Sequence, residues 1–246
     1  MKKIIVLMIM ILIVSGISLS GCSGGGGNDG EEVVKNEETV TDEEDDYSDG
    51  EEVTKDFDSD AILDQIKIEK LGSYERKFSN TTYRGYAIVA KNESEYDINL
   101  SATFIFKDKN KDLINSIDSD EYSVNAGGSM LIYVNDEMEP FEDVEVELDV
   151  SEPYSKVLSG ELKTKSTLRK DKVVIQLTNN SKKDAEYARV LCAFMSGDKL
   201  VDCNYEYCMN DDDILPAGKT RTCSLDWMGK NVDTVKVFAE GREATE

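Results

Sequence analysis

Residues 101–106 read Ser-Ala-Thr-Phe-Ile-Phe, a short alternating run of β-branched and aromatic residues that ends in a polar segment. Comparable runs occur at residues 130–134 and 144–148, and clusters of Asn, Asp and Gly close them. Alternation of this kind is typical of half-buried strands, and the only stretch that suggests a helical turn is residues 61–66. Many short strands separated by turn signals predict an all-β fold of sandwiches or small barrels.

The same order of signals occurs twice along the chain. Residues 91–94 (Lys-Asn-Glu-Ser) match residues 178–181 (Thr-Asn-Asn-Ser), and each motif follows an apolar strand. Further matches join Phe104 and Phe106 to Cys192 and Phe194, Leu113-Ile114 to Leu200-Val201, Ala126-Gly127 to Ala217-Gly218, and Val144-Glu145-Val146 to Val235-Lys236-Val237. This order predicts a tandem duplication, with β-sandwich repeats at 61–152 and 153–243 that are each large enough to enclose a small core.

A family resemblance rests on two of these stretches. Residues 104–108 (Phe-Ile-Phe-Lys-Asp) resemble the signature strand of FxLYD-type domains, which are immunoglobulin-like β-sandwiches of bacterial surface lipoproteins. Residues 215–220 (Leu-Pro-Ala-Gly-Lys-Thr) are similar to the Leu-x-Pro-Gly-x-Thr turn of such domains. Lys107 stands where the pattern has Tyr, and Cys192 replaces the first Phe in the second repeat. The resemblance implies two tandem immunoglobulin-like sandwiches in an extracytoplasmic setting, and it supplies no catalytic residues.

The N-terminus carries an export signal. Two lysines precede an unbroken apolar run at residues 4–14, which is shorter than the roughly 20 residues that span a bilayer. Residues 19–22 (Leu-Ser-Gly-Cys) resemble the lipobox of bacterial lipoproteins. This resemblance implies removal of a signal peptide at 1–21 and a lipid on the Cys22 sulfur, so the chain is expected on the outer face of the cell membrane. The alternative is an ordinary signal-peptidase site with an incidental cysteine.

An acidic segment follows the lipobox. Residues 23–60 contain 16 Asp and Glu against Lys35 and Lys55, and they begin with a run of glycines. Because like charges repel and apolar residues are sparse, residues 22–60 are predicted to be a disordered, extended tether. A loosely bound store of calcium is the alternative interpretation, although the spacing of a specific calcium loop is absent.

The overall charge excludes several kinds of function. The chain has 28 Lys and Arg, 51 Asp and Glu and no His, which gives a formal net charge of −23. So acidic a chain lacks the basic surface that binds nucleic acid, and no nucleic-acid partner is expected. Without histidine, neither a Ser-His nor a Cys-His nucleophile pair can form.

Four cysteines remain after Cys22, and all lie in the second repeat. In an exported domain an even number predicts two disulfides, for which three connectivities are possible. A two-residue turn at Gly197-Asp198 would place Cys192 opposite Cys203, which favours a 192–203 bond with a 208–223 bond. The alternatives are 192–223 with 203–208, a zinc site, or free thiols.

No enzyme or cofactor is expected. Ser196 and Lys199 have the Ser-x-x-Lys spacing of acyl-transferases, but they lie in a predicted hairpin turn instead of on a helix. A metal site is not expected either, and the weak candidates for calcium are Asp211, Asp212 and Asp213.

Two functions are compatible with these features. The first is a lipid-anchored surface protein without catalysis, an interaction and spacer module that binds another envelope protein. The aromatic and thioether side chains of Tyr205, Tyr207 and Met209 are the candidate contact patch. The alternative is an extracytoplasmic solute- or calcium-binding lipoprotein.

Overall fold

The computed structural model describes residues 56–209, 213–229 and 231–245, which all belong to one compact unit, Thr54–Glu246. The predicted signal peptide, the lipobox with Cys22 and residues 22–55 of the predicted tether lie outside the described residues. The last five tether residues are described, and among them Phe57 packs edge-on against Tyr96 with ring centroids 6.0 Å apart. None of the helices in the described ranges is long and apolar enough to cross a membrane.

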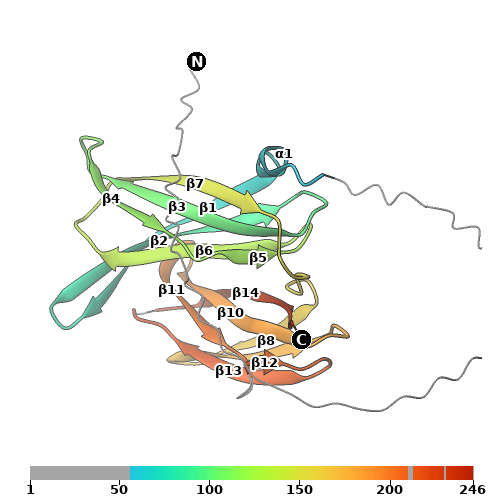
Figure 1. Cartoon of the computed structure of the whole chain (residues 1–246). Coiled ribbons are helices and arrows are strands. Elements are labelled where there is room, and N and C mark those ends of the chain that lie inside the picture. Colours follow the sequence, from blue (N-terminus) through green and yellow to red (C-terminus); the bar gives the residue numbers. More distant parts are fainter. Residues whose placement is uncertain (1–55, 210–212, 230, 246) are drawn as a thin grey trace, which may run out of the picture. The chain divides into compact units, whose positions relative to one another are not determined.

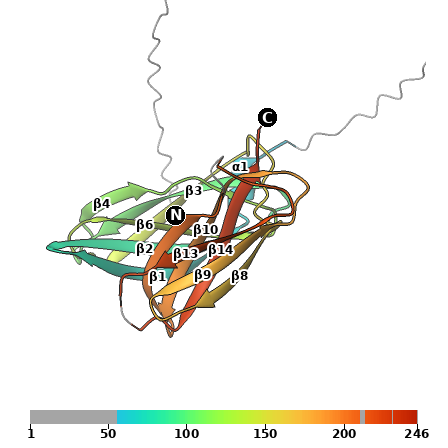
Figure 2. The ribbon, with the colours of Figure 1, turned by 90° about the horizontal axis from the view of Figure 1, so that it is seen from below.

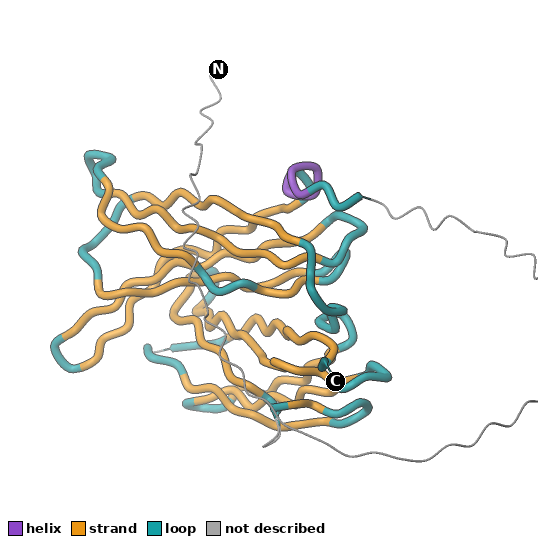
Figure 3. Tube along the Cα trace, in the orientation of Figure 1, coloured by secondary structure: helices purple, strands orange, loops and turns teal. Residues whose placement is uncertain are grey.

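The described residues form one short helix and fourteen strands, which confirms the predicted all-β fold (Figure 3). Helix α1 is Ser59–Leu63, and Asp58 caps its N-terminus by accepting a hydrogen bond from the Ala61 amide. The strands are β1 (Ile66–Phe78), β2 (Thr81–Asn92), β3 (Ile98–Lys107), β4 (Leu113–Asp118), β5 (Tyr122–Val124), β6 (Ser129–Glu137), β7 (Asp143–Ser151), β8 (Leu162–Leu168), β9 (Lys172–Asn179), β10 (Ala185–Ser196), β11 (Lys199–Tyr207), β12 (Ile214–Leu215), β13 (Thr220–Asp226) and β14 (Thr234–Glu243).

Strands β1–β7 form two antiparallel sheets that pack as a sandwich (Figure 1). One sheet has the order β1-β2-β6. In the other, β3 pairs with β7 along one edge and with β4 and then β5 along the opposite edge. Side chains such as Ile88, Phe104 and Ile132 fill the core between the two sheets, because alternate residues of each strand point to the same face.

Strands β8–β14 repeat this order strand for strand. One sheet is β8-β9-β13 (Figure 2). In the other, β10 pairs with β14 on one edge and with β11 and β12 on the opposite edge. A separate core of Val173, Ile175, Cys192 and Phe194 lies between these sheets. Trp227 packs against this core with its ring 5.2 Å from that of Phe194.

A third apolar layer lies between the two sandwiches. Leu191, Ala193 and Met195 of β10 pack with the first core and not with the second, although they alternate with residues of the second. The burial of β10 is therefore continuous from Ala188 to Met195. The β1-β2-β6 sheet is likewise covered on both faces, since successive residues of β6 from Met130 to Ile132 are all buried. A strand buried on both faces has a continuous apolar sequence instead of an alternating one.

At two positions that the repeat aligns, the residue is apolar in the repeat where it faces the layer between the sandwiches and polar in the other. The repeat aligns Thr103 with Leu191 and Glu147 with Phe238, and the apolar member of each pair lies in the layer between the sandwiches. The polar members are half-buried or exposed on the other side of the first sandwich. The two repeats thus have the same strands but different outer surfaces, because each covers a different face.

A close approach between strands requires glycine at one position in this layer. Gly85 of β2 lies opposite Tyr74 of β1, and a Cβ atom at residue 85 would come within 2.5 Å of the Tyr74 ring. Without a side chain on Gly85, the ring lies flat across the strand and its hydroxyl donates to the Val134 carbonyl at 3.5 Å.

The predicted Cys192–Cys203 disulfide is wrong, and the reason is a β-bulge. The two-residue turn at Gly197-Asp198 forms as expected, with Ser196 opposite Lys199. The register then shifts by one residue, so that Cys192 lies opposite Asn204 and Cys203 opposite Ala193. A shift of one residue reverses the face to which a side chain points. Cys192 therefore lies in the second core and Cys203 in the layer between the sandwiches, and both are free buried thiols.

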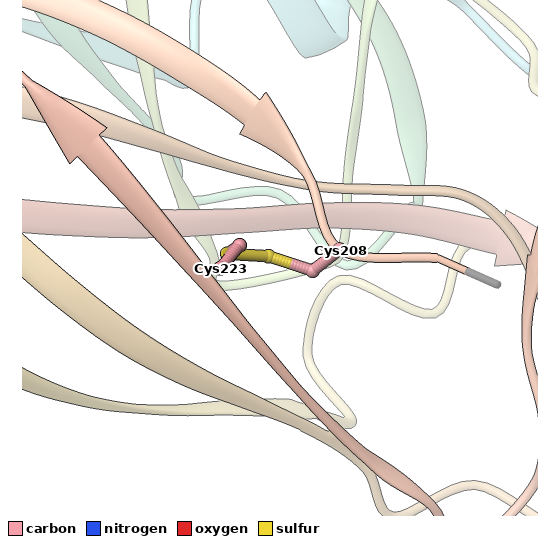
Figure 4. Close-up of a disulfide and its surroundings, with 2 residues drawn as sticks. All are labelled: Cys208 and Cys223. Carbon is pink, nitrogen blue, oxygen red and sulfur yellow. A yellow bond between two sulfur atoms is a disulfide. The ribbon is translucent and has the colours of Figure 1, made fainter.

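The other predicted disulfide, Cys208–Cys223, is present (Figure 4). It joins the residue after the end of β11 to the middle of β13, across the two sheets of the second sandwich. The crosslink closes a loop of 15 residues in sequence separation and lies against the second core.

Candidate interaction site

The predicted contact residues on β11 are exposed and adjacent. Tyr205 and Tyr207 point to the same side of β11, and their rings meet edge-to-face with centroids 5.7 Å apart. Met209 follows the strand and packs against the second core, so it is partly removed from the surface. Of the three residues named from the sequence, the two tyrosines are therefore the surface members.

A tyrosine that the sequence did not indicate joins them from β10. Tyr187 has a φ of 51°, in the left-handed region that bulky side chains rarely adopt. It occupies a bulge in which the pairing of β10 with β14 shifts between Glu186 and Arg189. The bulge places Tyr187 at the surface, where 51% of it is exposed. Periodicity gave no signal for this residue, because a bulge interrupts the alternation on which such predictions depend.

Arg242 of β14 connects Tyr187 to a fourth tyrosine. The guanidinium carbon of Arg242 lies 4.2 Å from the ring centroid of Tyr154 and 4.3 Å from that of Tyr187, and its Nε donates to Glu186 at 3.0 Å. Partial burial lowers the pKa of Arg242 from its ordinary value. We call Tyr154, Tyr187, Tyr205 and Tyr207 the tyrosine surface; their exposed fractions are 63%, 51%, 42% and 40%.

A second arginine, Arg189, lies beneath the rings of Tyr205 and Tyr207. Arg189 is buried, and its Nε donates to Glu240 at 2.6 Å while one terminal nitrogen lies 3.3 Å from Asp120 of the first sandwich. The guanidinium also lies 5.4 Å and 5.9 Å from the ring centroids of Tyr205 and Tyr207. Burial raises the pKa of the Glu240 carboxyl, even though Arg189 and the Ser123 amide both bind it. The site therefore combines residues of both sandwiches on a fixed, hydrogen-bonded base.

Two cavities flank the tyrosine surface, and Tyr187 and Tyr207 line both. One, of about 230 Å³, lies at the junction of the sandwiches and includes Asp120 and Glu121. The other, of about 540 Å³, includes Glu186 and Asp213. Together with Glu240, five carboxylates line these cavities against the two guanidiniums of Arg189 and Arg242. The site is thus aromatic and has an excess of negative charge.

The remaining predicted candidates lie in the β10–β11 hairpin and in the segment before β12. Ser196 and Lys199 face each other across the β10–β11 hairpin at the margin of a cavity of about 550 Å³, and neither lies on a helix. Asp211 and Asp212 lie outside the described residues, whereas Asp213 is exposed with a φ of 59°. Within residues 56–209, 213–229 and 231–245, no group of three or more His, Cys, Asp or Glu side chains is placed to hold a metal ion.

Comparisons with known proteins leave the function open. No protein-family model matches the chain, and no curated protein is similar to it. Among solved structures, the crystal structure of red sea bream transglutaminase aligns with 72% of this chain and 29% of that chain, at 9% identity and a TM-score of 0.25. A likeness this weak carries no argument about activity.

Proposed function

We propose that this chain is a lipid-anchored, outward-facing protein of the bacterial envelope that acts without catalysis, as a spacer and interaction module. Its two sandwiches are held away from the membrane by the acidic segment and bind another envelope protein through the tyrosine surface. The proposal for the anchor rests on the lipobox at residues 19–22 and on the apolar run before it.

The tyrosine surface is the observation that carries the interaction. Tyrosine and arginine are enriched at protein interfaces, because they combine a large apolar area with a polar group at its end. Four exposed tyrosines and two arginines gather here from a loop and three strands, β10, β11 and β14. Left-handed backbone at a bulky residue costs roughly 1–3 kcal/mol and is concentrated at functional sites, and Tyr187 is such a residue.

Site-specific crosslinking in intact cells tests the interaction. A photoreactive amino acid at position 205 is expected to give a crosslink to one defined envelope protein, identified by mass spectrometry. The same group at position 147, exposed on β7, is the matched control and is expected to give no such product. The crosslink from position 205 should disappear when Tyr187→Gly removes the neighbouring ring. Equal products from both positions, or none from 205, contradict the proposal.

The anchor has a separate test. Mass spectrometry of the N-terminal peptide from the membrane fraction should find diacylglyceryl on Cys22, and Cys22→Ser should move the protein out of that fraction. Recovery of an unmodified Cys22 peptide from membranes would remove the lipid anchor from the proposal and leave the interaction untouched.

A further inference from the structure

We infer that the segment recognised by the tyrosine surface is cationic and presents arginine side chains. This inference rests on the proposed function, and it adds the chemistry of the partner. Three features of the described residues carry it: a guanidinium already held between two rings, further exposed ring surface beside it, and an excess of carboxylates around both.

Arg242 shows that this surface binds a guanidinium. Its guanidinium carbon lies within 4.3 Å of the centroids of both Tyr154 and Tyr187, well inside the distance of about 6 Å at which cation–π attraction is significant. Glu186 completes the arrangement with a charge-assisted hydrogen bond of 3.0 Å. A pair of tyrosine rings and a carboxylate are thus arranged around one planar cation supplied by the chain itself.

Tyr205 and Tyr207 provide further ring surface of the same kind. Each contacts the buried Arg189 at a longer distance than that between Arg242 and its rings, and each keeps at least 40% of its surface exposed. An arginine from a partner can lie on the exposed part of these rings while its hydrogen-bond donors point toward a cavity that Tyr207 lines. Lysine offers the same charge but not the planar group that stacks on a ring.

The charges around the rings favour a cation over an anion. Arg189 and Arg242 are each matched by carboxylates in the structure, by Glu240 and Asp120 and by Glu186. Glu121 lines one cavity and Asp213 the other, and neither forms a salt bridge with a described residue, although the charge of Glu121 acts on Arg242 and partly offsets the lowering of its pKa. An approaching arginine would therefore meet a carboxylate without a salt bridge in each cavity.

The charge of the first sandwich acts in the same direction. Residues 61–152, which supply Asp120 and Glu121, carry 20 acids and 9 bases, whereas residues 153–243, which supply the four tyrosines, carry 14 acids and 15 bases. A field of one sign attracts an oppositely charged segment and raises its association rate, most strongly at low salt. It also repels an acidic partner, which argues against a carboxylate- or phosphate-bearing ligand at this site.

Peptide binding to the full mature chain in detergent tests this inference. The probe is a labelled decapeptide of alternating Gly and Arg, and its binding is followed by fluorescence anisotropy. Matched peptides of Gly with Lys and of Gly with Glu are compared at the same ionic strength. We expect the arginine peptide to bind best, the lysine peptide to bind more weakly, and the glutamate peptide not to bind.

Two sets of variants separate stacking from general charge attraction. Tyr187→Gly removes a ring at a φ that glycine tolerates, and Tyr205→Thr with Tyr207→Thr keeps β-branched residues on an exposed strand. Each is expected to weaken arginine-peptide binding about tenfold, as loss of one or two cation–π contacts requires. Glu147→Gln with Asp149→Asn removes two exposed acids from β7, and should change binding less than twofold.

Three results overturn the inference: unchanged binding in both tyrosine variants, equal weakening in the β7 variant, or equal binding of the arginine and lysine peptides. A specific crosslink from position 205 together with unchanged peptide binding leaves the proposed function standing and removes the arginine preference. Weaker peptide binding in the tyrosine variants together with no specific crosslink from position 205 supports the arginine preference and removes the proposed function.

Discussion

Asn92 and Asn179 occupy matching turns in the two sandwiches, and both are fully buried. The Asn92 amide donates to the carbonyls of Tyr96 and Asn125, and its oxygen accepts from the Ser94 amide and hydroxyl. Asn179 makes the equivalent contacts, to the carbonyls of Lys183 and Leu215 and from the Ser181 amide. The repeated Asn-x-Ser motif therefore connects two loops by hydrogen bonds at one end of each sandwich.

Replacing either asparagine should destabilise its sandwich. Asn179→Ala removes the hydrogen bonds from the Asn179 amide to the carbonyls of Lys183 and Leu215 and the one from the Ser181 amide, which is expected to lower the free energy of unfolding by about 2–4 kcal/mol. The exposed neighbour Asn180 is the control, and Asn180→Ala should change it by less than about 0.5 kcal/mol. Urea unfolding followed by circular dichroism measures both. Equal stability of the two variants would contradict this role.

The motif was visible in the sequence, but its hydrogen bonds were not. Two occurrences in the same order identified the repeat, because a duplicated fold keeps its turn residues. The carbonyls that each asparagine binds come from its own loop and from a segment 33 or 36 residues away. A contact over that distance depends on how the strands pair, which a single sequence does not specify.

At the scale of elements, β10 and β11 show what alternation predicts and where it fails. The hairpin forms as predicted, and Cys192 and Phe194 lie in the second core as their matched residues Phe104 and Phe106 lie in the first. Alternation gave the wrong partner for Cys192, because the bulge near Val201 adds one residue to β11. The second bulge of β10 hid Tyr187 in the same way. Tyr205 and Tyr207 could thus be predicted, whereas Tyr187 depends on an interruption of the pattern. Tyr154 lies in the loop between β7 and β8, where alternation gives no information.

The cysteine pairing has a direct chemical test. Mass spectrometry of the chain, alkylated after unfolding without reductant, should find Cys192 and Cys203 alkylated and Cys208 joined to Cys223. Before unfolding neither free thiol should react, because both are buried and burial raises the pKa of the Cys192 thiol to about 12. Reduction of the disulfide should cost about 3 kcal/mol of stability, the value for a loop of this length. A peptide joining Cys192 to any other cysteine would refute the assignment.

At the scale of the whole molecule, buried charged groups join the sandwiches. Arg76 of β1 donates to Asp202 of β11 at 2.6 Å. Glu240, which pairs with Arg189 within the second sandwich, accepts a hydrogen bond from the Ser123 amide of the first at 2.8 Å. Burial raises the pKa of both carboxyls above their ordinary values of 3.8 and 4.5, despite their arginine partners. The folded chain therefore binds protons at these groups more readily than the unfolded chain does.

The raised pKa of Glu240 makes the free energy of unfolding depend on pH. Because the folded pKa of Glu240 is raised, its contribution to stability is complete below 4.5 and is lost as the pH rises through the folded pKa. The free energy of unfolding should thus increase as the pH falls through the folded pKa of Glu240 toward 4.5, and Glu240→Gln should reduce that slope. Asp143 and Asp233, whose pKa values are lowered, act in the opposite direction below 3.8. Chemical unfolding at a series of pH values measures the slope, and an unchanged slope in the variant would count against this assignment.

The apolar layer between the sandwiches should make the two unfold together. The double variant Leu191→Thr with Phe238→Glu gives the second sandwich the residues that the first has at the matched positions, Thr103 and Glu147. It therefore removes apolar contacts from the layer between the sandwiches. We expect a loss of about 2–4 kcal/mol, because buried apolar groups are lost and a carboxylate replaces one of them. Trp227, the chain's single tryptophan, reports on the second core alone, whereas far-ultraviolet circular dichroism reports on all strands.

In the natural chain the two signals should change at the same urea concentration, since a shared layer couples both cores. In the double variant they should separate, because each sandwich keeps its own core but loses its neighbour. Glu147→Gln, on the exposed face of the first sandwich, is the control that should leave both transitions coincident. Coincident transitions in the double variant would mean that contacts other than those of Leu191 and Phe238, such as those of the buried charged groups, are sufficient for the coupling.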